Sequence, residues 1–438
     1  MSVDTPEFVL PKHLDEIDAR FMTKALRASG HIAVTDVVVT QEECGVGMTA
    51  GYFSAIKKVK CAYREARGVQ DSFVVKAWPP FEILPHEAIE AMFVKDIKAY
   101  AFPQAGFYPR PKTHLAAFDH ADNRWALIME DADSFAEHKV HENEMALDEV
   151  MSMLPKMVEV AVAWEGCETG EKAAQLEALG VDFWASDANL AIYKAVMPGG
   201  AKLFDRFTAT KNSTVVGEPT WDGYIGPGFA ELFTRKIDAF FRRARPENGA
   251  TCTLSHGDLR GDNIFFCEPS ADYPDGWLCI DFQLLFRGPV PSDLAYVMSS
   301  GSVLPEVYSG DGLNTVLRAF YDQFMARTSL YKDYAYERFV EEFAMMTMVP
   351  IVYFVGMGAA YWQGGARNEL PTRIELGGKG ATEADLTPEE LRQRMWWRKA
   401  FANYRSNLKT FGLYDLLKAL PETSEGLGEW VELPAHLR

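Results

Sequence analysis

The stretch Leu254–Phe266, LSHGDLRGDNIFF, places charged and polar side chains in a short loop that leads directly into an apolar run. His256 and Asp258 are two residues apart, and Asn263 follows Asp258 by five residues. The run Ile264–Phe266 is typical of a buried strand. A solvated loop does not need such a strand, and a core strand does not favour such charges. The stretch therefore predicts a loop that holds a catalytic base and a metal ligand.

A second apolar run, Trp277–Ile280, ends at Asp281. The preceding residues 273–276, YPDG, are typical of a turn between two strands. The resulting hairpin would bring Asn263, at the start of one strand, beside Asp281, at the end of the next. An amide oxygen and a carboxylate are hard oxygen ligands that suit Mg²⁺ carrying phosphates. Asp258 would then be able to accept a proton from an attacking hydroxyl group.

Length and composition limit the class of protein. A chain of 438 residues is too long for one compact core, so two domains or lobes are expected. Hydrophobic residues at 48% and charged residues at 24% exclude disorder of the whole chain. The formal net charge of −18 repels phosphate backbones, so we expect no nucleic acid partner. The charge would favour a cationic ligand, although a generic acidic surface is the commoner explanation. No obligate protein partner is evident.

The cysteines and the apolar segments indicate a cytoplasmic protein without membrane attachment. The six cysteines form neither a CxxC pair nor a Cys/His cluster at zinc spacing, which fits a reducing cytosol. The N-terminus lacks the charged and apolar regions of a signal peptide. The segment Met345–Trp362 is about as long as a membrane span. It contains Pro350, Gly356 and Gly358, however, so a buried helix is the better interpretation.

Residues 1–131 alternate between helical and strand-like patterns. An amphipathic helix over 12–29, closed by Gly30, is followed by five β-like runs. A helix lies between the third and the fourth run, from about 86 to 102. The five runs cover 31–40, 52–62, 72–78, 113–118 and 124–130. These patterns predict a small mixed domain.

Helical periodicity dominates residues 132–438, which we expect to form the second domain. Two strand-like segments interrupt it, one flanking the loop at 254–266 and the other at 277–285. The Gly-rich segment 363–386 is expected to be a long loop. The expected helices cover 146–164, 227–244, 310–328 and 333–362, and a further one begins at Thr387.

The loop His256–Asn263 has the form H-G-D-x-x-x-x-N, and I-D-F follows about twenty residues later. This pattern resembles the catalytic core of the protein-kinase-like small-molecule kinases, which include aminoglycoside phosphotransferases, choline kinases and ecdysteroid kinase-like enzymes. The stretch 280–298, IDFQLLFRGPVPSDLAYVM, most resembles the ecdysteroid kinase-like branch, whose pattern is D-F-Q, a short loop and D-L-A-Y. Choline kinases usually carry an acidic residue where Gln283 stands.

The resemblance implies an α+β fold of the protein-kinase-like, two-lobe type. Residues 1–131 would form a nucleotide-binding lobe with a small five-stranded antiparallel sheet and one helix. Residues 132–438 would form a large, mainly helical lobe with the catalytic loop, the metal ligands and the substrate pocket. The implied activity is transfer of the γ-phosphate of ATP, with Mg²⁺, to a hydroxyl group of a small molecule.

The resemblance also implies roles for the residues around the loop. Asp258 would be the catalytic base, and Asn263 and Asp281 would hold Mg²⁺. Asp293 would brace the loop through backbone N–H groups, and His256 would be a hydrogen-bonded positioning residue. Arg260 is expected either to touch phosphate or substrate or to form a salt bridge that braces the loop.

The nucleotide would be held by the first lobe. Lys76 ends the apolar run 72–75, where a lysine is costly unless it meets an anion such as the α- and β-phosphates of ATP. An edge-strand lysine that reaches solvent is the alternative. The stretch with Gly45, Gly47 and Gly51 is neither a dinucleotide fingerprint nor a P-loop, and alone it indicates only a turn. By the resemblance it would cover the phosphates.

Two further features of this lobe follow from the resemblance. The family helix reads roughly Glu-x-x-x-Tyr, and Asp96 to Tyr100 fall in this register as the acid that would pair with Lys76. Because Asp is one methylene shorter than Glu, the helix must approach more closely or a water must bridge, and Glu90 and Glu87 remain alternatives. The backbone of Glu130, Asp131 and Ala132 would meet the adenine.

The sequence leaves two questions open. One is a second function, a nucleotide-binding pseudokinase that acts as a regulator or scaffold, for which Asp96 in place of Glu is the support. The other is the phosphate acceptor, since choline-like, aminoglycoside-like, steroid-like and hydroxyacyl molecules all suit the pattern. Aromatic residues of the second lobe offer a surface for a sterol-like or quaternary ammonium ligand. Ordinary core packing is the commoner role of such side chains, which here are Tyr353, Phe354, Tyr361, Trp362, Trp396 and Trp397.

Overall fold

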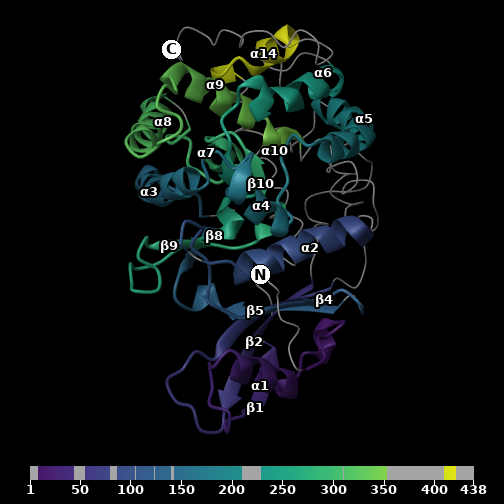
Figure 1. Ribbon diagram of the computed structural model, residues 1–438, viewed down its shortest axis with the longest axis vertical. Helices are drawn as coiled ribbons and strands as arrows, with labels where there is room; N and C mark the ends of the chain where they lie inside the picture. The colour runs from purple at the N-terminus through teal and green to yellow at the C-terminus, as the bar shows by residue number, and fades with distance from the viewer. Residues whose placement is uncertain are drawn as a thin grey trace. The chain divides into compact units, whose positions relative to one another are not determined.

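Figure 1 shows the computed structural model of the chain. The chain divides into two compact units, which are described separately. Unit 1 consists of Met1–His138, Ala178–Gly180 and Phe265–Leu284. Unit 2 consists of Lys139–Glu177, Val181–Ile264 and Leu285–Arg438. The structure describes residues 8–43, 55–78, 86–103, 105–122, 124–139, 143–209, 228–308, 310–352 and 409–420.

Unit 1 contains a five-stranded antiparallel sheet with the strand order β1-β2-β3-β5-β4 (Figure 1). The helix α2, His86–Ala101, lies between the third and the fourth strand along the chain. This arrangement confirms the predicted fold class for the first part of the chain. The strands are β1 Val38–Glu43, β2 Ala55–Tyr63, β3 Ser72–Ala77, β4 Thr113–Asp119 and β5 Arg124–Glu130.

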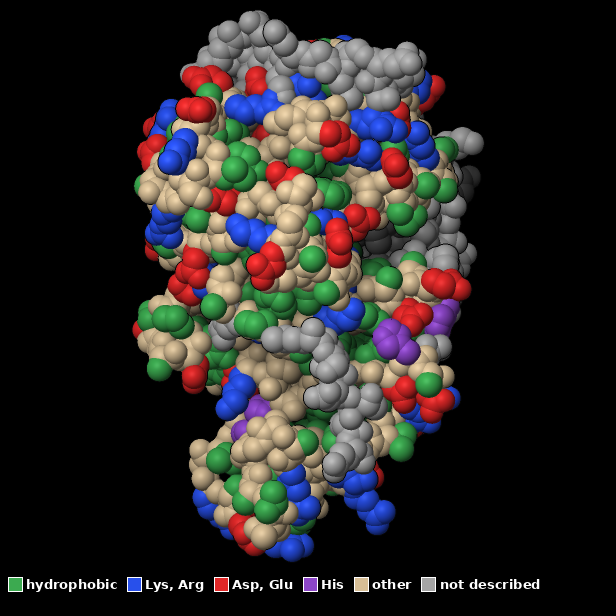
Figure 2. Space-filling view, viewed as in Figure 1, with side chains coloured by type: hydrophobic (Ala, Val, Ile, Leu, Met, Phe, Trp, Pro, Cys, Tyr) green, Lys and Arg blue, Asp and Glu red, His purple; other side chains and the backbone are tan. Residues whose placement is uncertain are grey.

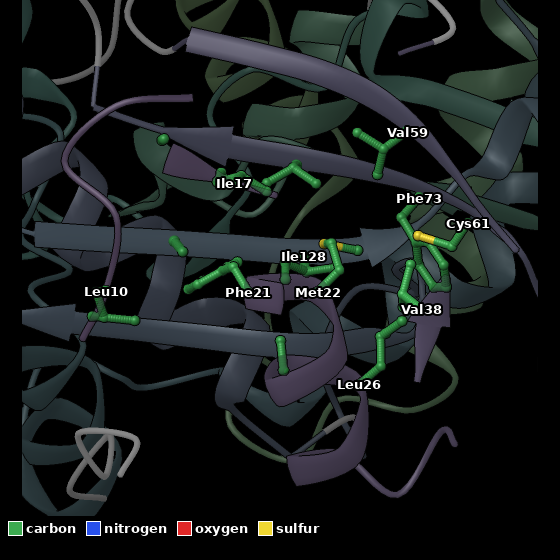
Figure 3. Close-up of a cluster of buried hydrophobic side chains, with 14 of the residues drawn as sticks. Leu10, Ile17, Phe21, Met22, Leu26, Val38, Val59, Cys61, Phe73 and Ile128 are labelled. Atoms are coloured by element: carbon green, nitrogen blue, oxygen red, sulfur yellow. The ribbon is translucent and has the colours of Figure 1, made fainter. Parts of the chain in front are cut away.

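The two faces of this sheet are covered by different helices. The helix α1, Ala19–Ala28, packs Phe21, Met22 and Leu26 into a buried cluster with strand residues such as Phe73 (Figure 3). Because side chains alternate along a strand, Lys76 on β3 projects from the face opposite to Phe73. On that opposite face the ring of Phe93 from α2 stacks on Trp125 of β5, with ring centroids 4.3 Å apart. The sheet therefore directs Lys76 toward the side of α2.

The start of the chain differs from the prediction of one helix over 12–29. A short 3₁₀ helix η1, Leu14–Glu16, is separated from α1 by an extended Asp18. The Asp18 side chain accepts a hydrogen bond of 2.8 Å from the backbone N–H of Phe21, so it caps a new helix instead of continuing the old one. The strand expected over 31–40 begins only at Val38, because the Asp36 carboxylate accepts a hydrogen bond from the N–H of Val37 in a turn.

Unit 1 also contains most of a small sheet with the order β6-β8-β9. Its strands are β6 Glu137–His138, β8 Ile264–Phe266 and β9 Trp277–Cys279. Gly276 has a φ of +71° in the predicted turn at 273–276, and its N–H donates to the oxygen of Tyr273. The strand predicted over 277–285 ends at Cys279, because Asp281 adopts a left-handed backbone with φ +73°. A 3₁₀ turn η5, Phe282–Leu284, follows.

The described part of unit 2 is mainly helical, as predicted. A two-stranded antiparallel sheet joins β7, Thr253–Ser255, to β10, Phe286–Gly288. The sequence patterns did not separate β10 from the run before it. The helices are α3 Leu147–Ala163, α4 Gly170–Ala178, α5 Asp187–Ala209, α6 Phe229–Arg243, α7 Ser292–Ser299, α8 Gly310–Met325, α9 Tyr336–Met346, α10 Val349–Val352 and α14 Leu413–Ala419. Short 3₁₀ turns are η2 Ala132–Ser134, η3 Pro246–Asn248 and η4 Gly261–Asn263.

The helix predicted over 333–362 is divided in the structure. α9 ends at Met346, and α10 begins at Val349 beside Pro350, whose missing N–H cannot continue the hydrogen bonds of the preceding helix. The rest of this segment, the loop 363–386 and the helix expected from Thr387 lie outside the described residues. In the part of the chain that the structure describes, no helix is both long enough and apolar enough to cross a membrane. Figure 2 shows acidic and basic side chains interspersed on the face in view.

Candidate active site

Lys76 is the centre of the first group of predicted site residues, all of which belong to unit 1. Its Nζ atom lies 3.3 Å from Asp96 Oδ2 and 3.3 Å from Asp281 Oδ1. The side chains of Lys76 and Asp96 are buried, whereas that of Asp281 is 24% exposed. A buried ammonium group is therefore shared by two carboxylates, of which one also faces solvent. The edge-strand interpretation of Lys76 is wrong, because its side chain does not reach solvent.

Asp96 reaches Lys76 directly, so neither a bridging water nor one of the alternative acids is needed. Glu90 lies instead 3.4 Å from the ring of His120, and Glu87 is exposed. The second carboxylate oxygen of Asp96, Oδ1, accepts a hydrogen bond of 2.8 Å from the backbone N–H of Phe282. One side chain of α2 thus connects the lysine to the turn that follows Asp281.

The backbone of Asp281 is strained, because an L-residue with a side chain rarely adopts a positive φ. Two residues of α2, one turn apart, hold this conformation. The N–H of Asp281 donates to the hydroxyl of Tyr100 over 3.4 Å, and Asp96 accepts from the next N–H, that of Phe282. Gln283 in turn donates through Nε2 to Asp281 Oδ2 over 3.3 Å. The carboxylate of Asp281 is therefore oriented by Lys76 on one oxygen and by an amide on the other.

Burial and charge oppose each other in this group. Burial alone would lower the pKa of Lys76, but the carboxylates of Asp281 and Asp96 outweigh it and raise that pKa above its ordinary value. Burial raises the pKa of Asp96 to about 6, although Lys76 and the N–H of Phe282 favour its ionised form. Lys76 is therefore charged at neutral pH, and the pKa of Asp96 lies closer to neutrality than that of an ordinary aspartate.

The stretch Glu130–Ala132 follows directly from β5. The N–H of Asp131 donates to the backbone oxygen of Ser72 over 3.1 Å, and the Asp131 carboxylate accepts from the Ser72 hydroxyl and lies 2.9 Å from Lys58 Nζ. Asp131 and Ala132 are buried. Asp131 therefore anchors the end of β5 to the neighbouring strand β3. Gly45, Gly47 and Gly51 lie outside the described residues.

The second group of predicted residues lies on the loop His256–Asn263, in unit 2. Asn263 Nδ2 donates to Asp258 Oδ2 over 3.1 Å and to the backbone oxygen of Asp258 over 2.8 Å. The hydroxyl of Tyr296 donates to the other oxygen, Asp258 Oδ1, over 2.6 Å. Arg260 Nε lies 3.5 Å from the same atom. The carboxylate of Asp258 is therefore held by donors on both of its oxygens.

The backbone of this loop is braced by Asp293 in the first turn of α7. Its two carboxylate oxygens accept hydrogen bonds from the N–H groups of His256, over 2.8 Å, and Gly257, over 3.1 Å. This arrangement confirms the contact predicted for Asp293. His256 is fully buried, and its Nδ1 accepts from the N–H of Asp258 over 3.3 Å. The histidine therefore makes the hydrogen bond expected of a positioning residue.

Two further residues fix the second half of the loop. Arg260 forms ion pairs within the loop, to Asp258 and, over 3.6 Å, to Asp262, which is the bracing arrangement. The N–H of Gly261 donates to the Ser302 hydroxyl over 2.7 Å. A Cβ atom on Gly261 would collide with the backbone oxygen of Lys139, so only glycine fits this close approach.

Sequence reasoning missed three of these contacts. Tyr296 and Tyr100 were visible only as the last letters of the D-L-A-Y and Asp96-to-Tyr100 patterns, which do not show where a hydroxyl points. Ser302 gave no signal, because a serine 41 residues from Gly261 is joined to it only by the fold.

Asn263 in unit 2 and Asp281 in unit 1 each carry an oxygen of the kind that ligates a divalent cation. Because Asn263 donates through Nδ2, its Oδ1 is the side that can ligate a cation, and Asp281 offers a partly exposed carboxylate. Among the described residues, no group of three or more His, Cys, Asp or Glu side chains could hold a metal ion by itself. Mg²⁺ in nucleotide-dependent enzymes usually has one or two protein carboxylates, with substrate phosphates and water as the other ligands.

The five-stranded sheet with its helix and buried lysine, followed by a mainly helical part, defines a protein-kinase-like, two-lobe fold. Residues 118–331 match the model of the ecdysteroid kinase-like family. This region is just under half of the chain, and over this part the chain is similar to that family.

Comparison with solved structures finds similar chains at low sequence identity. An ethanolamine kinase from Plasmodium vivax is 10% identical with a TM-score of 0.48, and the match covers 82% of this chain and 85% of that one. The GDP complex of wild-type aminoglycoside 2'-phosphotransferase-IIIa is 11% identical with a TM-score of 0.44, covering 82% and 97%. Amicoumacin kinase hAmiN, in complex with AMP-PNP, Ca²⁺ and Ami, is 10% identical with a TM-score of 0.42, covering 90% and 94%. No curated protein sequence matches the chain.

Proposed function

We propose that the protein transfers the γ-phosphate of ATP, with Mg²⁺, to a hydroxyl group of a small molecule. The observation that carries the proposal is the position of Lys76, with Nζ 3.3 Å from both Asp96 and Asp281. A buried cation between two acids, beside a strained backbone, is costly and is typical of a functional site. The match of residues 118–331 to the model of the ecdysteroid kinase-like family supports the same conclusion.

Lys76 is the residue that would hold the α- and β-phosphates. Its ammonium group has three donors, so it can keep Asp96 as a partner while it binds a phosphate oxygen. Asp96 also fixes the turn at Phe282, so the lysine and Asp281 would be positioned by the same side chain. The backbone of Glu130, Asp131 and Ala132 would meet the adenine, and the loop with Gly45, Gly47 and Gly51 would cover the phosphates.

Asn263 and Asp281 are the proposed ligands of Mg²⁺. When bound, the cation would supply charge neutralisation on the transferred phosphoryl group. Gln283 would keep the Asp281 carboxylate in its orientation through the bond to Oδ2.

Asp258 is the proposed catalytic base. It would orient the hydroxyl group of the acceptor and take its proton as the new bond forms between that oxygen and the γ-phosphorus. The bond between the γ-phosphorus and the bridging oxygen breaks at the same time, and ADP leaves. Catalysis in this scheme depends on positioning and electrostatics rather than on a covalent intermediate.

A reducing, cytoplasmic location is part of the proposal. The sequence supports it, since its six cysteines form neither a CxxC pair nor a Cys/His cluster at zinc spacing. The alternative function, a regulator that binds nucleotide without turnover, was supported by the shorter side chain of Asp96. Since Asp96 contacts Lys76 directly, that support is removed.

The test is an assay of ADP formation from Mg·ATP with a panel of hydroxylated metabolites, preceded by a thermal-shift screen with a non-hydrolysable ATP analogue and Mg²⁺. We expect at least one alcohol to stimulate ADP formation, and we expect D258N to abolish the stimulation while it still binds Mg·ATP. Binding of Mg·ATP without turnover across the panel would favour the regulator. A D258N variant as active as the wild type would refute the assignment of the base.

A further inference from the structure

The hydroxyl group of Tyr296 lies against the carboxylate that we assign as the base. Tyr296 donates to Asp258 Oδ1 over 2.6 Å, and its side chain is buried. A hydrogen bond of this length to an ionised carboxylate is charge-assisted and about twice as strong as one between neutral groups. We propose that Tyr296 is a positioning residue that fixes the orientation of Asp258 for proton transfer. This inference rests on the proposed function.

The helix α7 attaches to the catalytic loop at two points. Asp293, in its first turn, accepts hydrogen bonds from the loop backbone at His256 and Gly257. Tyr296 follows three residues later, and residues three apart lie on the same face of a helix. One buried helix therefore fixes both the backbone of the loop and the carboxylate of Asp258.

The contacts of Asp258 show what the tyrosine adds. Asn263 holds Oδ2 over 3.1 Å, and Tyr296 holds Oδ1 over 2.6 Å. Donors on both oxygens set the plane of the carboxylate, and the bond from Tyr296 is shorter than the 3.5 Å approach of Arg260 Nε to the same oxygen. A carboxylate offers about four acceptor positions, so this arrangement is compatible with taking a proton from a substrate.

The expected effect follows from the sensitivity of catalysis to position, since a displacement of about 1 Å at a reacting group can cost about 100-fold in rate. The variant Y296F removes only the hydroxyl group and keeps the buried ring. We expect kcat for ADP formation to fall by about 10- to 100-fold. The KM and the Kd for Mg·ATP should stay within about twofold of the wild type, because nucleotide affinity depends on other residues.

The structure offers a matched control in the same unit. Tyr334 is buried, and its hydroxyl donates to Glu342 Oε2 over 2.6 Å, the same kind of bond at the same length. Tyr334 and Glu342 lie outside the proposed site. We expect Y334F to keep the wild-type kcat at a temperature where all variants are folded. A general loss of structure would lower kcat in both variants, so the pair separates positioning from stability.

The assay measures steady-state ADP formation from Mg·ATP, with water and with the alcohol panel as acceptors, for wild type, Y296F, Y334F, D258N and the double variant D258N/Y296F. Because Tyr296 acts through Asp258, the double variant should be no slower than D258N. Wild-type kcat in Y296F, or an equal loss in Y334F, would overturn the role of Tyr296. If the wild type forms no Asp258-dependent ADP, the proposed function fails, and this inference fails with it.

Discussion

Asp96 joins two separate parts of unit 1, because it binds Lys76 through one carboxylate oxygen and the N–H of Phe282 through the other. The lysine belongs to β3, and Phe282 follows the strained residue Asp281. An aspartate one methylene shorter than the expected glutamate thus makes both contacts directly. Its position explains how the chain forms the ion pair with an aspartate in place of the glutamate of the Glu-x-x-x-Tyr pattern.

Replacing Lys76 should reveal what the buried cation contributes to stability. The variant K76M leaves the buried Asp96 carboxylate facing Asp281 without a cation, and breaking a buried ion pair typically costs about 3 to 5 kcal/mol. We expect the free energy of unfolding, measured by urea denaturation, to fall by about that amount. The double variant K76M/D96N should recover part of the loss, because it removes the uncompensated charge. A K76M chain as stable as the wild type would show that the pair does not form.

Nucleotide affinity should depend on pH through Asp96. Its pKa is raised from 3.8 to about 6, so Asp96 takes up a proton as the pH falls through about 6, and Lys76 then loses one of its two partners. We expect the Kd for Mg·ATP, measured by calorimetry, to rise by about tenfold from pH 8 to pH 5 in the wild type. The variant D96N imitates the protonated acid, so it should bind weakly at both pH values with a flatter profile.

The expected rise in Kd at low pH cannot be explained by unfolding that results from protonation of Asp96. Because its folded-state pKa is raised, the ionised form of Asp96 costs stability above about pH 6, and this group favours the folded state more as the pH falls. The nucleotide also titrates between pH 5 and pH 8, and the change in Kd of the D96N variant over this range measures that contribution. An equal pH dependence in both proteins would contradict the role of Asp96.

The positive φ of Asp281 leads to a prediction about three substitutions at one position. All three remove the carboxylate from Lys76, but they differ in their tolerance of φ +73°. Glycine and asparagine adopt this conformation more readily than alanine. We therefore expect D281G and D281N to be more stable than D281A by about 1 kcal/mol, measured by thermal unfolding. Equal stabilities for the three variants would mean that the residue is not strained.

Much of unit 1 could be predicted from the sequence, because its strands and its main helix have clear periodicity. The pattern at 72–76 indicated both the strand β3 and a lysine in need of an anion. The break at Ile17–Asp18 and the late start of β1 were missed, because a single capping carboxylate decided each. The strand expected through Asp281 was wrong for a related reason, since the left-handed turn there is stabilised by Asp96 and Tyr100, which are distant in the sequence.

The contacts of the candidate site could likewise be predicted from the sequence only in part. The spacing from Asp258 to Asn263 predicted the residues of the loop, and their hydrogen bond is local. The contacts from Tyr296 and Ser302 depend on how helix α7 and the segment after it pack against the loop. Such contacts cannot be obtained from periodicity, because a hydroxyl-bearing side chain in a buried helix has the same pattern whether or not it meets a carboxylate.

The most direct test of the account is whether a phosphate ester forms and whether its formation requires Asp258. The measurement is ³¹P NMR of wild type and D258N with Mg·ATP and the alcohol that stimulates ADP formation most strongly. We predict a new phosphomonoester signal, equal in amount to the ADP produced, in the wild type and none in D258N, although both bind Mg·ATP. A phosphomonoester formed equally fast by D258N, or ADP formed by the wild type with only inorganic phosphate as its partner, would contradict the account.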